Sequence, residues 1–89
     1  MVYLHLGNNT IVRMSDIVGI FDLDSSTISY KTRDFLSLAE KNGQVVNVSL
    51  ELPKSFVICR ENDGCKIYIC QLSPATLMKR AEQISLMAE

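Results

Sequence analysis

The feature that most constrains the fold is a pair of apolar runs, 55–60 and 65–72, joined by the sequence ENDG at 61–64. Asp-Gly in so short a spacer favours a tight turn, so the two runs predict a β-hairpin. In this hairpin Glu61 and Lys66 are expected to lie opposite each other. Both runs are apolar at odd and even positions, whereas an antiparallel sheet with one wet face alternates apolar and polar residues. The second face must therefore be covered by a helix or by another subunit.

The N-terminal part of the chain predicts a second hairpin followed by a buried strand. Apolar residues alternate over 2–6, and the sequence GNN at 7–9 favours a turn into a partner strand over 10–14. The run 17–23 is apolar on both faces, which is typical of a central strand. Gly19 within this run predicts a bulge or a close backbone approach.

Two segments carry the signals of helices. From Ile28, apolar residues recur at helical spacing, and Asn-Gly at 42–43 is a typical helix end. Ser73 and Pro74 are residues favoured at the N-cap and the first position of a helix, so a second helix is expected to begin there.

The segment 44–52 alternates as a strand does, with Leu50 and Leu52 among its inward residues, and Pro53 ends it. Together with the other elements, this strand predicts an α+β fold with a mixed or antiparallel sheet of five or six strands and two helices. The segment 1–89 contains no repeat and no linker, and it is expected to form a single domain.

Charge and hydropathy exclude several classes of protein. The 89 residues carry a formal net charge of −1, so no general positive potential surrounds a monomer, and DNA binding requires a local basic patch. No apolar run reaches the roughly 20 residues that span a bilayer. The N-terminus lacks the basic flank and apolar core of a signal peptide. The expected location is the cytoplasm, without a membrane partner.

No group of residues forms a catalytic or metal-binding motif. Cys59, Cys65 and Cys70 have spacings that match no zinc motif, and they are expected to be reduced structural thiols. His5 is the only histidine and has no nucleophile or carboxylate arranged beside it in sequence. We therefore expect a non-enzymatic protein that uses no cofactor, no metal and no small-molecule substrate.

The cationic residues are the remaining functional candidates, although each one alone is more typical of an ordinary surface charge. Lys54 lies at a corner between strands, Arg60 and Lys66 flank the hairpin turn, and Arg13 lies on the second strand. A homo-oligomer would repeat these charges and multiply phosphate contacts, so the four residues are candidate contacts to duplex DNA.

Apolar residues in excess of one small core predict an interface between copies of the chain. The hairpin is apolar on both faces, and the last helix carries a second apolar stripe. The candidate interface residues are Phe56, Ile58, Tyr68 and Met78.

Four sequence pieces occur in a characteristic order: HLG at 5–7, DIVGIFD at 16–22, PKS at 53–55 and LSPATLMKRA at 72–81. They resemble the Rem family of extracellular-matrix regulatory proteins, and within it the RemB-like branch. The resemblance implies a bacterial cytoplasmic protein that regulates transcription of biofilm-matrix genes. In the RemA branch it implies direct DNA binding by a ring-shaped homo-oligomer, on a fold similar to the LytTR DNA-binding domain.

The resemblance also implies where DNA is contacted. RemA-like members carry two adjacent arginines at the corner before the hairpin, and Leu52 and Pro53 stand at the matching positions here. Lys54 is the only cation beside them, and lysine lacks the bidentate phosphate contact of arginine. Two functions stay open. One is a DNA-associated regulator in which Lys54 acts with Arg60 and Arg13. The other is a protein-interaction module that modulates a regulator without binding DNA itself.

Overall fold

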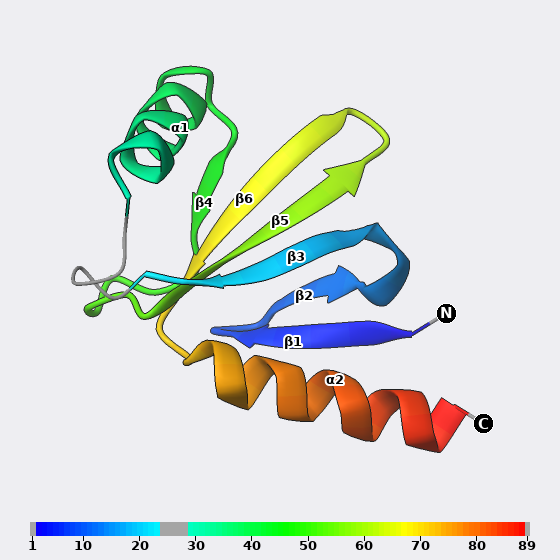
Figure 1. Cartoon of the computed structure of the whole chain (residues 1–89). Helices are drawn as coiled ribbons and strands as arrows, with labels where there is room; N and C mark the ends of the chain where they lie inside the picture. The colour runs from blue at the N-terminus through cyan, green and yellow to red at the C-terminus, as the bar shows by residue number, and fades with distance from the viewer. Residues whose placement is uncertain (1, 24–28, 89) are drawn as a thin grey trace.

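The computed structural model describes residues 2–23 and 29–88, which form an α+β fold (Figure 1). The strands are β1 (Tyr3–Gly7), β2 (Thr10–Arg13), β3 (Ile17–Asp22), β4 (Val45–Asn47), β5 (Ser55–Glu61) and β6 (Gly64–Cys70). The helices are α1 (Tyr30–Lys41), α2 (Pro74–Ala88) and a short 3-10 turn, η1 (Met14–Asp16). None of the helices in these ranges has the length and apolarity needed to cross a bilayer.

The six strands form two sheets, whereas the sequence predicted one. Strands β1 and β2 make an antiparallel hairpin of their own, and the larger sheet has the order β3-β5-β6-β4. In the larger sheet β4 runs parallel to β6, while the other neighbours are antiparallel. The α+β class, the two predicted helices and a mixed sheet are therefore confirmed, with the strands divided between two sheets.

The predicted β5–β6 hairpin is confirmed, but its register differs from the expected one. Glu61 pairs with Gly64, so two residues form the loop, and Lys66 lies opposite Cys59. Glu61 and Lys66 are consequently diagonal neighbours on one face instead of directly opposed. A diagonal pair is still within reach of a long side chain.

Strand β3 lies at the edge of the sheet, which corrects the prediction of a buried central strand. Its hydrogen-bonded neighbour is β5, and the side chains of Val18 and Phe21 are 62% and 42% exposed. The segment 17–23 is apolar, but it is therefore not buried on both faces by its own chain. The bulge predicted at Gly19 is confirmed, because the register shifts between Ile17 and Gly19.

Strand β4 is much shorter than the predicted strand 44–52. It ends at Asn47, and Leu50 and Leu52, which were predicted to point inward, are 100% and 82% exposed. Pairing with β6 continues only as far as the hydrogen bond from Val48 N to Ile69 O. Strand β6 ends one residue later, so the chain beyond Val48 has no neighbouring strand to follow.

The two faces of the larger sheet are covered differently. Val57, Cys59 and Leu77 belong to a core shared with β1, β2 and α2, and Figure 1 shows α2 running alongside β1. On the opposite face, Phe56 packs in a smaller core with Ala39 of α1. Figure 1 shows α1 beside β4, at the far edge of the sheet from β3. The prediction that a helix covers the second face is therefore confirmed for the part near β4.

Local capping signals correctly predicted the C-terminal end of α1 and the start of α2. Ser73 Oγ accepts a hydrogen bond from Thr76 N at 3.2 Å, and Pro74 is the first residue of α2. Helix α1 ends before Gly43, whose φ of 72° suits glycine. The predicted onset at Ile28 lies outside the described residues, and α1 begins at Tyr30.

Candidate nucleic-acid interface

The corner at Lys54 is held by main-chain hydrogen bonds on both sides. Lys54 N donates to Cys70 O at 2.8 Å, and Lys54 O accepts from Leu23 N at 2.9 Å. The corner is thus tied to the ends of β6 and β3. The exposed Lys54 side chain lines an open cavity of about 420 Å³, together with Asp22 at the end of β3 and with Ser73 and Pro74 at the start of α2. A cation, a carboxylate and the positive end of a helix dipole therefore border the same space.

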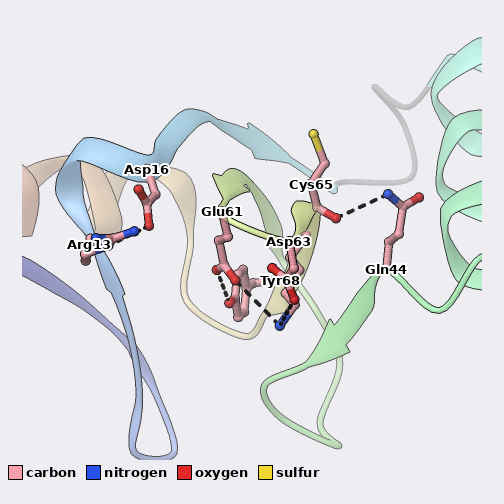
Figure 2. Close-up of polar contacts among 8 residues, drawn as sticks. Arg13, Asp16, Gln44, Glu61, Asp63, Cys65 and Tyr68 are labelled. Carbon is pink, nitrogen blue, oxygen red and sulfur yellow. Dashed lines mark hydrogen bonds and ion pairs between the residues drawn. The ribbon is translucent and has the colours of Figure 1, made fainter.

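Arg13 is occupied by a carboxylate of its own chain. Arg13 Nε lies 2.9 Å from Asp16 Oδ2 across the η1 turn (Figure 2). The Asp16 side chain is only 15% exposed, so solvent screens this pair less than it would a fully exposed one. A phosphate group would have to compete with Asp16 for the Arg13 guanidinium.

Lys66 is also surrounded by acidic side chains. Its Nζ lies 3.5 Å from Glu61 Oε1 and 3.9 Å from Asp63 Oδ2. Glu61 accepts a further hydrogen bond from the hydroxyl of Tyr68 at 2.6 Å (Figure 2). Burial, and then this hydrogen bond, raise the pKa of Tyr68 above its ordinary value. The hairpin end is therefore a compact network in which Lys66 is already paired.

Arg60 is exposed on β5 and, within residues 2–23 and 29–88, forms no ion pair. The same holds for Lys54. These two residues lie at opposite ends of β5, about 20 Å apart at the rise of an extended strand. Among the described residues, the four predicted DNA contacts therefore divide into two cations that form ion pairs, Arg13 and Lys66, and two distant cations that form none.

Comparison with known proteins identifies the family. The family model for extracellular matrix regulatory protein A-like (RemA-like) proteins matches residues 3–81. The chain belongs to this family. Extracellular matrix regulatory protein B of Bacillus subtilis (strain 168) is 40% identical to it over 81 residues, which cover 91% of each chain. The predicted Rem family and its RemB-like branch are therefore confirmed.

The four candidate interface residues of this RemA-like chain differ in accessibility. Phe56 and Tyr68 are 4% and 8% exposed, because both pack within the chain. Ile58 is half-buried, and Met78 on α2 is 50% exposed. Ile58 and Met78 thus keep more apolar surface available to a partner than the other two.

Sequence reasoning missed Leu50, Leu52 and Phe21 as surface residues. All three belong to runs that read as buried strands, and only the end of β6 and the edge position of β3 leave them exposed. Pro53, just beyond the leucines, was the one local signal that the strand stops nearby.

The cysteines of the RemA-like chain are free thiols in different environments. Cys59 and Cys70 are buried, and Cys65 is exposed at the start of β6. Burial raises the pKa of Cys59 to about 12 and that of Cys70 to about 11. The two buried thiols are therefore unreactive core residues at neutral pH.

Proposed function

We propose that this chain is a cytoplasmic, DNA-associated transcriptional regulator of extracellular-matrix genes that acts as a homo-oligomer. Membership of the RemA-like family, and a relative named extracellular matrix regulatory protein B, support a regulatory role. A non-enzymatic action and a fold of the LytTR type belong to the same proposal.

The main observation behind the proposal is that the Lys54 side chain is exposed while its backbone is held by hydrogen bonds. Its ammonium group is exposed, and among the residues that the structure describes it has no carboxylate partner. Its backbone is fixed at both ends of the corner, so the side chain extends from a rigid support. Within residues 2–23 and 29–88, this lysine has no ion pair to break before it contacts a phosphate oxygen.

The low net charge of the chain favours DNA binding by an oligomer over DNA binding by a single copy. The net charge is −1, and the two candidate cations without an ion pair among the described residues lie about 20 Å apart, so one copy provides few phosphate contacts. A homo-oligomer repeats Lys54 once for each subunit. Duplex affinity then depends on the number of subunits that reach the backbone.

Binding of a fluorescent DNA duplex, measured by anisotropy as a function of salt, tests the proposal. We expect binding at about 50 mM salt that weakens steeply as the salt concentration rises. Lys54→Ala should weaken it and reduce the slope of log affinity against log salt by about 0.9 for each phosphate that Lys54 neutralises. Lys66→Ala is the matched control, because Lys66 is paired with Glu61 and Asp63. No binding at low salt, or unchanged binding by Lys54→Ala, would contradict the proposal.

A second function is favoured by the apolar character of the same corner. Leu52 is 82% exposed and precedes Pro53 and Lys54, so most of the corner offers a protein-binding surface instead of a cationic one. In this alternative the chain modulates a regulator without binding DNA. An intact oligomer that fails to retain any duplex at low salt would favour it.

A further inference from the structure

Ser55 is a buried polar residue at the corner that carries Lys54. It is 0% exposed, although its neighbour Lys54 is exposed. Ser55 is the first residue of β5, and its strand partners are Asp22 at the end of β3 and Cys70 at the end of β6. Three strands therefore meet at this serine. A hydroxyl buried in such a place destabilises the fold unless it is hydrogen-bonded.

The Ser55 hydroxyl is hydrogen-bonded to the segment that joins β6 to α2. Its Oγ donates to Leu72 O at 2.6 Å. Strand β6 ends at Cys70 and α2 begins at Pro74, so Leu72 lies outside both elements. Within residues 2–23 and 29–88, no main-chain hydrogen bond reaches Leu72 O. Among these residues, the serine hydroxyl thus supplies the partner that this half-buried carbonyl needs.

This bond adds a restraint of a different kind to the corner. The two main-chain hydrogen bonds of Lys54 join the corner to Leu23 and Cys70, at the ends of β3 and β6. The Ser55 bond instead joins the corner to the residue just before Ser73, which caps α2. Lys54 and the start of α2 border the same cavity. The serine therefore fixes the main chain of the corner relative to the helix.

We propose that Ser55 is a positioning residue for the DNA contact made by Lys54. Its hydroxyl holds the corner against the start of α2, and the corner fixes the point from which the Lys54 side chain extends. A lysine side chain is long and flexible, so a fixed main chain limits the space that its ammonium group samples. The inference rests on the proposed function, because DNA is the ligand in both.

A purely structural role of Ser55 predicts a different outcome. If the hydroxyl only stabilised the fold, its loss would lower the resistance to urea but would leave the DNA affinity of the folded protein unchanged. A positioning residue affects the affinity as well, and it does so only while Lys54 is present. The effects of the two substitutions on DNA binding are then not additive.

Amide hydrogen exchange of Ser55→Ala, measured by NMR, tests the restraint without DNA. The Leu23 and Lys54 amides should exchange about 5- to 30-fold faster, because one lost hydrogen bond shifts a local opening equilibrium by this factor. Amides of the β1–β2 hairpin should change less, which separates local loosening from global unfolding. Ser49→Ala is the matched control, because its hydroxyl bonds the exposed Gln71 side chain. Unchanged exchange at Leu23 and Lys54 would overturn the inference.

Anisotropy of a fluorescent duplex at about 50 mM salt tests the link to Lys54. Ser55→Ala should weaken binding by no more than Lys54→Ala does, and it should reduce the salt slope by up to about 0.9 for each lost phosphate contact. The double variant Lys54→Ala/Ser55→Ala should bind as Lys54→Ala does. Additive losses, or an unchanged affinity of Ser55→Ala, would refute the positioning role.

Ser55→Cys replaces the alanine variant if that variant does not fold. The thiol keeps a weak donor, and a reducing agent prevents its oxidation with Cys70, its strand partner. Its duplex affinity should lie between those of the wild type and Lys54→Ala. An affinity equal to that of the wild type, with unchanged exchange at the corner, would count against the inference.

The two proposals fail separately. A wild-type protein that binds no duplex would reject the proposed function and with it the DNA contact, whereas the exchange rates would still decide whether Ser55 restrains the corner. Duplex binding that depends on Lys54 but not on Ser55 would keep the proposed function and reject the inference.

Discussion

The hydroxyl of Tyr68 donates a 2.6 Å hydrogen bond to Oε2 of Glu61 across the β5–β6 hairpin (Figure 2). Tyr68 is 8% exposed, so water has little access to this bond. The other carboxylate oxygen of Glu61 faces Lys66 Nζ at 3.5 Å. Glu61 therefore links a buried phenol to a surface cation and keeps that cation paired.

Tyr68→Phe should lower the free energy of unfolding by about 1–2 kcal/mol, because it removes the shielded hydrogen bond while retaining the aromatic ring. Urea denaturation measures the change. Tyr30→Phe is the matched control and should have no measurable effect, because Tyr30 is 79% exposed on α1. Equal stability of the Tyr68 variant and the wild type would show that the bond contributes nothing.

Leu77→Ala should lower the free energy of unfolding by about 2–5 kcal/mol, because Leu77 on α2 is fully buried in the larger core and its truncation leaves a cavity. The neighbouring Met78→Ala should change it by less than about 0.5 kcal/mol in the monomer, since Met78 is half exposed. Thermal or urea unfolding compares the two. Similar losses in both variants would contradict the orientation of α2.

Stability should fall as the pH rises from 9 toward 11. The folded pKa values of Cys59 and Cys70 lie near 12 and 11, above the ordinary thiol value of 9.0. Their stabilising contribution is therefore complete below pH 9.0 and is lost as the pH rises toward the folded values, because the unfolded thiols ionise first. Urea unfolding at several pH values measures the slope. Cys59→Ala should flatten it, whereas Cys65→Ser, at an exposed position, should leave it unchanged.

Gly19→Ala should lower the free energy of unfolding by about 1–3 kcal/mol, because its Cβ would overlap the Phe21 ring and displace it from Phe56. A double-mutant cycle with Phe21→Ala tests this cause. Once the ring is absent, Gly19→Ala should cost little, so the two effects should not add. Additive effects would mean that Gly19 is required for another reason.

Local signals predicted several parts of the fold correctly from the sequence. The Gly-Asn-Asn turn forms with φ of 44° at Asn8 and 63° at Asn9, which asparagine tolerates. The Ser73 cap and the β5–β6 turn also lie where the sequence predicts them. Each of these features depends on residues close together in the chain, so neighbouring residues are sufficient to specify it.

The candidate site was predicted less completely. The sequence named Lys54, Arg60, Arg13 and Lys66 as cations and placed Glu61 opposite Lys66, but it did not predict that Asp16 pairs with Arg13 or that Asp63 also lies beside Lys66. An ion pair depends on the distance between two charged side chains, and a change of one residue in the strand register alters that distance. The register placed Lys66 opposite Cys59, and only the length of lysine restored its contact with Glu61.

By itself, the sequence determined the α+β class, the C-terminal end of α1, the start of α2, the turns and the family, because these rest on local conformation and on residue order. Only the tertiary structure decided that β3 lies at an edge, that β4 ends at Asn47, and that Leu50, Leu52 and Phe21 are exposed. An apolar strand pattern indicates that a residue favours burial, but it does not indicate whether its own chain or another chain buries it. That depends on which strands become neighbours across long separations in sequence, and here it leaves Leu50 and Leu52 almost fully exposed and Phe21 partly exposed.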